Sequence, residues 1–401
     1  MSLTQGSGTA ITSTIVVGTK PVAGVRVEVR QSGVLVATGT SAADGSLRIE
    51  VPGAGRYQVH LIASTLPKGV TLAAGSRTTL EPIVREGFSS PVVFRIVDAS
   101  TATDEGPSSS TRVLGLLASG LRFGLVIALA SVGLSLIFGT TGLTNFAHGE
   151  MLTFGAIATW YFNDLGLNLV LAAVGGVLVS GVFGAVLELG LFRPLRRRRM
   201  PDLSVMVVSI GLALFLRYLF AIIFGGSPRQ YNEYAAQSPT VKLGPISLPP
   251  KDLVIMAVSA AMLLGIGLFL QRSRLGTAIR AVSDDRDLSE SSGIDVQRVI
   301  LTVWVLSAAL AGMGGVLLGT TDTVVWNMGQ RVLLVMFAAV VLGGLGTAFG
   351  AMAGGLVVGI VSDLSTYWLD ADLKIVVALG ALVIVLLVRP SGIFGVRARS
   401  A

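Results

Sequence analysis

The chain has 401 residues, of which 52% are hydrophobic and only 13% are charged, with a mean hydropathy of +0.76. Soluble domains carry about 25% charged residues, so this composition excludes a soluble globular protein and predicts a polytopic membrane protein. The net charge of +7 comes largely from arginines in short loops between apolar runs, which is typical of membrane orientation signals and not of nucleic-acid binding. With no cysteine and two histidines, the chain offers no disulfide or thiolate metal site, and we expect no metal and no cofactor.

Residues 1–97 place apolar side chains at every second position, which is the period of half-buried antiparallel strands. Asp44-Gly45 and residues 52–55 predict hairpin turns between such strands. Short strands with frequent turns predict a small all-β sandwich. We expect its core to contain Val25, Val27, Val29, Leu47, Ile49, Val51, Tyr57, Val59, Leu61, Val92, Phe94 and Ile96.

The runs PVAGVRVEVR and TSAADGSLRIEVPGAGRYQVHL resemble the Ig-like modules of the transthyretin-like and carboxypeptidase-regulatory type. The resemblance implies a sandwich domain and names no ligand for it. Residues 98–112 are polar and poor in bulky apolar side chains, which predicts a flexible linker. The chain begins MSLTQGSGTA, without a basic or an apolar region. Either the first span translocates the N-terminal tail itself or a signal peptide lies upstream of Met1, and we favour the second explanation.

Residues 113–396 form the predicted membrane domain, followed by a cytoplasmic tail at 397–401. Apolar runs were compared with the roughly 20 residues that cross a bilayer. Nine spans are expected, at 113–139, 147–163, 168–192, 203–225, 252–271, 299–319, 330–345, 348–366 and 373–389.

Arginine clusters predict the orientation of these spans, because cytoplasmic loops carry an excess of basic residues. One cluster lies at 193–199, a second at 272–286 and a third at 389–399. Even numbers of spans separate the clusters, so all three fall on one side, which we assign to the cytoplasm. Three spans precede the first cluster, so this parity places residues 1–97 outside the cell.

The stretch 133–156 interrupts the apolar runs with polar side chains. A bilayer tolerates such a break only where it is buried in protein or lines a wet cavity. Gly142 and Gly149 bracket the break and predict a discontinuous helix of the kind that forms transport sites. We therefore expect the translocation path to be bordered by Thr141, Asn145, His148, Gly149 and Glu150.

Residues 271–298 form the longest polar segment of the membrane domain. Arg280, Asp284, Asp287 and Glu290 fall at helical intervals and Gly293 stands where a helix C-cap is expected, which predicts one or two short surface helices. On charge pattern alone, a solvated connector is the favoured interpretation of this segment. The chain has no phosphate-binding loop, so we expect no enzymatic activity of its own.

Two further features of the spans concern helix packing and charge pairing. Glycines recur every four residues at 346, 350 and 354 and at 355 and 359, which predicts close contact between helices. Glu188 and Arg217 lie inside apolar runs, and the sequence does not decide whether they pair.

The run GLTNFAHGEM with the upstream GLSLIFG resembles the permease subunits of branched-chain amino acid ABC transporters, the LivH type. The resemblance extends from about 114 to 395 and includes RPLRRRR, LGTAIRAVSDDRDLSESSGID, GGLGTAFGA and RPSGIFG. It implies an inner-membrane importer subunit that works with ATP-binding cassette ATPases, a second permease subunit (LivM type) or a second copy, a solute-binding protein and membrane lipid. It also implies an ATPase-coupling loop that contains Gly276, Arg280, Ala281, Asp285 and Gly293.

Three other functions remain open at this stage. A permease of the same family for urea, short amides or another small solute would share these motifs. A proton-coupled carrier would use His148 and Glu150 without partner subunits. A surface-anchored adhesion or receptor module would explain the β-sandwich but does not require so many spans.

Overall fold

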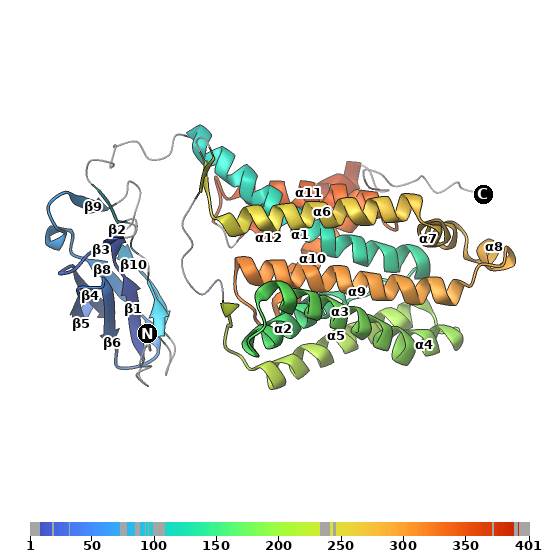
Figure 1. Ribbon diagram of the computed structural model, residues 1–401, viewed down its shortest axis with the longest axis horizontal. Helices are drawn as coiled ribbons and strands as arrows, with labels where there is room; N and C mark the ends of the chain where they lie inside the picture. Colours follow the sequence, from blue (N-terminus) through green and yellow to red (C-terminus); the bar gives the residue numbers. More distant parts are fainter. Residues whose placement is uncertain are drawn as a thin grey trace. The chain divides into compact units, whose positions relative to one another are not determined.

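The computed structural model describes residues 9–17, 20–31, 33–72, 78–84, 89–92, 94, 96–98, 109–232, 241–243, 246–370, 373–388 and 392. The chain divides into two compact units, Met1–Ser109 and Ser110–Ala401 (Figure 1). The first unit contains β-strands and the second consists mainly of α-helices. Most of the predicted linker, residues 99–108, and the predicted tail at 397–401 lie outside the described residues.

The strands of the first unit enclose one apolar core. All twelve residues predicted for this core are buried, because alternation places every second side chain on the same face of a strand. Three of the sheets have the strand orders β12-β1-β6, β10-β8-β4-β5 and β3-β2-β13-β9, and β11 pairs with β7. The strands are β1 (Ala10–Thr14), β2 (Val16–Val17), β3 (Lys20–Pro21), β4 (Arg26–Gln31), β5 (Val34–Thr40), β6 (Ser46–Glu50), β7 (Gly55–Arg56), β8 (Gln58–Leu61), β9 (Val70–Leu72), β10 (Thr79–Leu80), β11 (Ile83–Val84), β12 (Ser89–Pro91) and β13 (Ile96–Asp98).

The two predicted turns exist, but neither closes a hairpin. Gly45 adopts a φ of +75° and Ser46 N–H donates to Asp44 Oδ1 (3.0 Å), as in a tight turn. The strands on either side, β5 and β6, belong to different sheets, and so do β6 and β8 around residues 52–55. The hairpin interpretation was therefore wrong, because a turn signal marks a reversal of the chain and does not say which strands pair.

The second unit is a bundle in which the nine predicted spans correspond to α1, α2, α3, α5, α6, α9, α10, α11 and α12. By length and composition, six helices of the described residues can cross a membrane, and α10 and α12 are shorter apolar helices. The helices are α1 (Ser109–Thr141), α2 (His148–Asp164), α3 (Leu169–Leu187), α4 (Arg193–Arg197), α5 (Asp202–Phe224), α6 (Pro250–Arg272), α7 (Arg274–Asp284), α8 (Arg286–Ser291), α9 (Val296–Thr321), α10 (Met328–Gly343), α11 (Ala348–Ser365) and α12 (Lys374–Val388), with a hairpin of β14 (Val241–Leu243) and β15 (Ile246–Leu248).

Helix α1 begins at Ser109, inside the segment predicted as linker. Nothing after this position breaks a helix, and serine is well suited to the helix start. The apolar stretch of α1 is 78% buried, whereas no more than 33% of the stretches in the spans of α3, α5 and α6 is buried. The other helices therefore pack around α1, and the outer helices present apolar faces to the surroundings.

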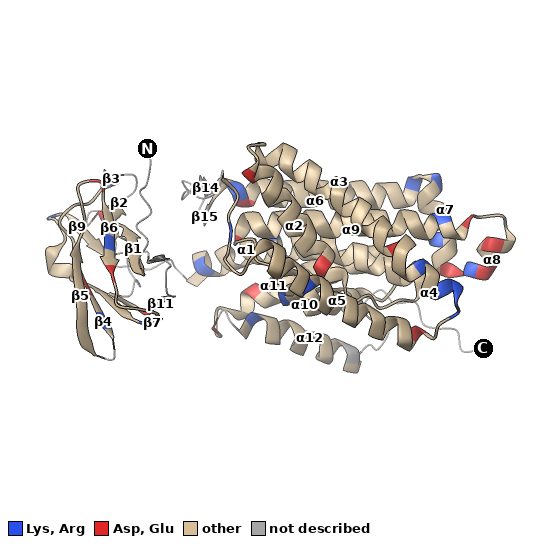
Figure 2. Cartoon of the chain, turned by 90° about the horizontal axis from the view of Figure 1, so that it is seen from below, with Lys and Arg blue, Asp and Glu red and all other residues tan. Residues whose placement is uncertain are grey.

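Glycines allow α11 to pack closely against α1, as their spacing predicted. A Cβ on Gly355 would meet the Ala128 Cβ at 2.7 Å, and one on Gly359 would meet the Gly120 carbonyl oxygen at 2.8 Å and the backbone of Gly124 more closely still. The two helices therefore touch backbone to backbone, which is how helices pack in a membrane when small residues line the contact. Charged residues gather on and around α4, α7 and α8 at one end of the bundle (Figure 2).

Candidate functional site

The first broken helix lies where the polar stretch was predicted. Helix α1 ends at Thr141, and Gly142 follows with a φ of +70°. The next helix, α2, begins at His148, whose Nε2 donates to the Ala130 carbonyl oxygen at 2.9 Å. Ala130 precedes Thr141 by 11 residues, or about 16 Å of helix. The chain therefore turns back along α1 before α2 starts inside the bundle.

The residues between α1 and α2 find hydrogen-bond partners inside the protein. Ala147 N–H donates to Asn145 Oδ1 at 3.0 Å, and Phe146 N–H donates to the Ser209 hydroxyl of α5 at 3.2 Å. The Phe146 ring packs against Phe337 of α10, with centroids 5.0 Å apart. Asn145 and His148 are both 0% exposed. We refer to residues 142–147 as the first re-entrant segment.

Three buried polar atoms at this site lack a partner among the described residues. They are the amide nitrogen Nδ2 of Asn145, the ring nitrogen Nδ1 of His148 and the carboxylate oxygen Oε2 of Glu150. Buried polar groups are usually satisfied, so unsatisfied ones are expected where a ligand or water binds or where the structure moves.

Glu150 pairs with Arg217 of α5 instead of lying free. Its Oε1 accepts from Arg217 Nε at 3.2 Å and lies 3.1 Å from Nη2, and the side chains are 1% and 11% exposed. The pair neutralises both charges in an apolar interior. The alternative pairing of Arg217 with Glu188 does not occur, because Glu188 accepts two hydrogen bonds from Arg196.

A second broken helix was missed by the sequence reasoning. Gly319, Thr320 and Thr321 end α9, and Gly329 follows after seven residues near the start of α10. The pattern Gly-Thr-Thr, seven residues, Gly also stands at 139–149, at an offset of 180 residues (319 − 139). A search for internal repeats would have found this signal. We refer to residues 322–327 as the second re-entrant segment.

The two broken helices share local geometry. Thr140 and Thr141 donate to the carbonyl oxygens four residues earlier, at 2.9 and 2.6 Å, in the last turn of α1. Thr320 and Thr321 do the same in the last turn of α9, at 2.8 and 3.1 Å. The hydroxyls thus occupy carbonyls at the point where each helix stops.

The N-terminal ends of α2 and α10 meet inside the bundle. A Cβ on Gly149 would lie 2.8 Å from the Gly329 carbonyl oxygen, and Gly329 N–H donates to the Thr153 hydroxyl of α2 at 3.0 Å. Only glycines permit this backbone contact. The contact joins the two repeats at the ends of their broken helices, an arrangement typical of inverted repeats in transporters.

The polar segment 271–298 folds into α7 and α8, as predicted. Ser273 and Asp285 cap the two helices by accepting from Gly276 N–H at 2.8 Å and Leu288 N–H at 2.9 Å. Gly293 has a φ of +84° and donates to the Glu290 carbonyl oxygen, which closes α8 with a Schellman motif. The starts of α7 and α8 and the end of α8 are thus each fixed by a cap. A solvated connector would not need such caps.

The α7–α8 segment contacts the first broken helix. A Cβ on Gly139 in α1 would collide with the Ser283 hydroxyl of α7, and one on Gly276 would lie 2.6 Å from the Leu270 Cα at the end of α6. A cavity of about 160 Å³ lies beside this contact, lined in part by Thr141, Leu143 and Arg286. Arg280 and Asp285 are exposed, whereas Ala281 is half-buried and Gly276 is buried.

The structure separates the predicted site residues into two groups. Asn145, His148, Gly149 and Glu150 lie together at the start of α2, and Thr141 lies at the cavity. The predicted coupling residues lie on α7, at its junction with α8 and just after α8. The contact between Gly139 and Ser283 brings α7 to the end of α1.

These features define a polytopic helical membrane protein with two broken helices, capped surface helices and a separate strand-rich unit. Residues 116–387 match the family described as branched-chain amino acid transport system / permease component, and the chain belongs to this family. A permease component is a transport subunit and not an enzyme.

Relatives cover most of the membrane unit. The high-affinity branched-chain amino acid transport system permease protein LivH of Escherichia coli K12 is 32% identical over 291 residues, which are 69% of this chain and 94% of that protein. BraD of Pseudomonas aeruginosa, of the same description, is 32% identical over 298 residues, covering 70% and 94%. A probable LivH of Methanocaldococcus jannaschii is 28% identical, covering 70% and 92%. A solved structure, PsaBC from Streptococcus pneumoniae in complex with Fab, aligns with a TM-score of 0.40 at 13% identity over 69% of this chain and 92% of that chain, which does not establish a shared fold.

Proposed function

We propose that the chain moves branched-chain amino acids, or a related small amphipathic solute, inward as one permease subunit of an ABC importer. The observation that carries the proposal is the contact between Gly139 and Ser283, which joins the capped α7–α8 segment to the broken helix with the NFAHGE run. The names of LivH and BraD support branched-chain amino acids as the solute. Urea or short amides are the alternative solutes.

In this proposal, ATPase subunits dock on α7 and α8 through Gly276, Arg280, Ala281, Asp285 and Gly293. Movement of α7 would reach the end of α1 through Ser283 and the end of α6 through Gly276. The path would open along Thr141, Asn145, His148, Gly149 and Glu150 from the cavity beside Thr141. Because four of these five residues are buried, opening requires the broken helices to separate.

We further propose that the end of the bundle with α4, α7 and α8 faces the cytoplasm of a bacterium. Basic residues gather there, as cytoplasmic loops require (Figure 2). The first unit then lies outside the cell, as an Ig-like sandwich that a solute-binding protein can reach. The remaining partner is a second permease subunit, of LivM type or a second copy.

The test is reconstitution in proteoliposomes with the cognate ATPase, second permease and binding protein. We expect ATP-dependent uptake of leucine, isoleucine and valine, no uptake of urea, and no ATP hydrolysis by the chain alone. Uptake of urea or short amides in place of amino acids would overturn the solute, and uptake without the ATPase would overturn the subunit role.

Single cysteines test the path, since the native chain has none. Asn145→Cys is expected to be inert to polar thiol reagents at rest and to react during ATP-driven turnover. Ser362→Cys, at a buried position on α11 whose hydroxyl donates to the Val358 carbonyl oxygen, is the control and is expected to stay inert throughout. Equal behaviour of the two sites would move the path elsewhere.

A proton-coupled carrier is the second candidate, because Glu150 is a carboxylate inside the bundle. Its pairing with Arg217 favours a structural role instead. Uptake that persists when the proton gradient is collapsed, and stops when ATP is withheld, would exclude the carrier.

A further inference from the structure

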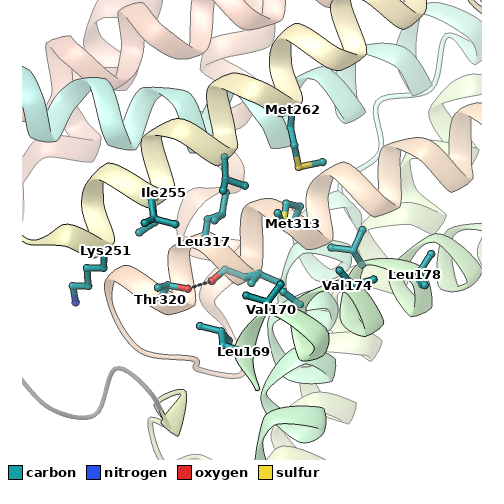
Figure 3. Close-up of a pocket in the computed structure, with 15 residues that line it drawn as sticks. Leu169, Val170, Val174, Leu178, Lys251, Ile255, Met262, Met313, Leu317 and Thr320 are labelled. Atoms are coloured by element: carbon teal, nitrogen blue, oxygen red, sulfur yellow. Dashed lines mark hydrogen bonds between the residues drawn. The ribbon is translucent and has the colours of Figure 1, made fainter. Parts of the chain in front are cut away.

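A groove of about 370 Å³ lies on the membrane unit between α3, α6 and α9 (Figure 3). Side chains from 15 residues line it, and all are apolar except Lys251 and Thr320. The Thr320 hydroxyl donates to the Val316 carbonyl oxygen at 2.8 Å, so it offers no free donor to a ligand. The groove is therefore an apolar channel with one cation at one end.

The length of the groove matches one leaflet of a bilayer. It begins at Lys251, near the start of α6, and reaches Met262 after 11 residues, or about 16 Å of helix. Half of a typical hydrocarbon core is about 15 Å. Met262 and Met313 line the groove away from Lys251 with flexible thioethers that adapt to an occupant.

The lining favours a lipid chain over a protein helix as occupant. Helices that associate in a membrane use small residues at the contact, as Gly355 and Gly359 do against α1. Branched apolar side chains such as Val174 and Leu178 line the groove instead and remain 54% and 66% exposed. A flexible acyl chain adapts to such an uneven surface, whereas a rigid helix would need a face of complementary shape.

Lys251 adds charge selectivity. Among the described residues no acidic group lies within ion-pair distance of it. The neighbouring Asp252 is paired with Arg122 at 2.6 Å and does not neutralise it. We propose that the groove binds one acyl chain of an anionic phospholipid whose headgroup pairs with Lys251. In the proposed orientation this is a lipid of the outer leaflet.

The experiment is native mass spectrometry of the detergent-purified full chain, titrated with phosphatidylglycerol or with phosphatidylcholine of the same acyl chains. We expect one tightly bound lipid and about a fivefold preference for phosphatidylglycerol, the ratio that corresponds to about 1 kcal/mol per basic residue near an anionic surface. Lys251→Gln is expected to remove the preference and keep the binding. Val174→Trp is expected to remove binding of both lipids.

Matched controls separate the groove from general effects. Lys68→Gln changes an exposed lysine of the first unit, and Leu214→Trp adds the same bulk to an exposed position on α5; both are expected to bind lipid like the wild type. Equal affinity of the wild type for the two lipids would overturn the proposal, as would unchanged binding by Val174→Trp.

A photo-crosslinking residue at Val174, used in intact membranes with all subunits present, tests the occupant without a purified variant. Crosslinks to phospholipid are the expected result. Crosslinks to another protein chain would show that a subunit covers the groove and would overturn the proposal.

Discussion

Removal of Arg217 from its pair with Glu150 is expected to destabilise the membrane unit strongly. Glu150 is 1% exposed and Arg217 11%, so Arg217→Met leaves a carboxylate in a site that water does not reach. Breaking one partner of a buried pair costs about 3–5 kcal/mol. Because both groups are much less than a third exposed, screening by solvent does not reduce this figure appreciably.

The double variant Glu150→Gln/Arg217→Met separates pairing from the loss of either side chain. Replacing both charges is often close to neutral, so we expect it to recover most of the stability, with a coupling free energy of about 2 kcal/mol or more. The control Arg298→Met makes the same change in an exposed pair, where the side chain is 87% exposed, and is expected to cost less than about 1 kcal/mol.

The measurement is reversible unfolding of the purified chain in mixed detergent, followed by the fluorescence of its tryptophans. If Arg217→Met costs less than about 1 kcal/mol, or if the double variant is as unstable as the sum of the single ones, the reasoning on the pair is wrong. ATP-driven uptake by the double variant then gives a second readout. Its retention would show that the Glu150 carboxylate is not a proton carrier.

Three further predictions follow from the contacts. Gly359→Ala is expected to cost about 1–3 kcal/mol, because its Cβ meets backbone of α1, whereas Gly380→Ala, with nothing within 4 Å, is expected to be nearly neutral in the same unfolding assay. Gly293→Pro, which cannot adopt a φ of +84°, and Arg280→Glu are each expected to lower uptake with normal membrane abundance; wild-type uptake in both would make α7–α8 a mere connector. Deletion of residues 1–105 behind a grafted signal is expected to leave uptake at saturating binding protein intact, and complete loss at normal abundance would place the first unit in the transport step.

The strand core and the span positions were predictable because both depend on local patterns. Alternation fixes which face of a strand is buried, so Val27, Val59 and the other core residues followed from spacing alone. The capped α7–α8 segment was predictable for the same reason, since Gly293 and the charged residues mark helix faces and ends. Sheet pairing was not, because Ser46–Glu50 pairs with a strand more than thirty residues earlier.

The sequence does not predict which charged side chains of the spans form ion pairs. Glu188 and Arg217 appear as charges in apolar runs and Arg196 as one arginine of a basic cluster, and nothing local ranks the possible partners. In a regular helix, residues eight apart lie about 12 Å apart along the axis. The π-helical turn at Glu188–Phe192 changes the helical register between Glu188 and Arg196, and such turns leave no pattern in the sequence.

The sequence also did not predict how deep in the bundle the broken helices start, because hydropathy locates a polar break but does not say how far the chain turns back.

In the structure the first broken helix is part of a continuous series of contacts. Ser283 of α7 touches Gly139, three residues before the first re-entrant segment, and that segment leads to Gly149, which meets Gly329 of the other repeat. Apart from the Ser283 hydroxyl, these contacts are made by glycine backbone, which has no flexible side chain to absorb a shift of α7. If α7 docks an ATPase as proposed, a two-state movement of α7 would bias the Gly149–Gly329 contact through this series, which is the physical requirement for coupling between the proposed docking surface and the proposed path.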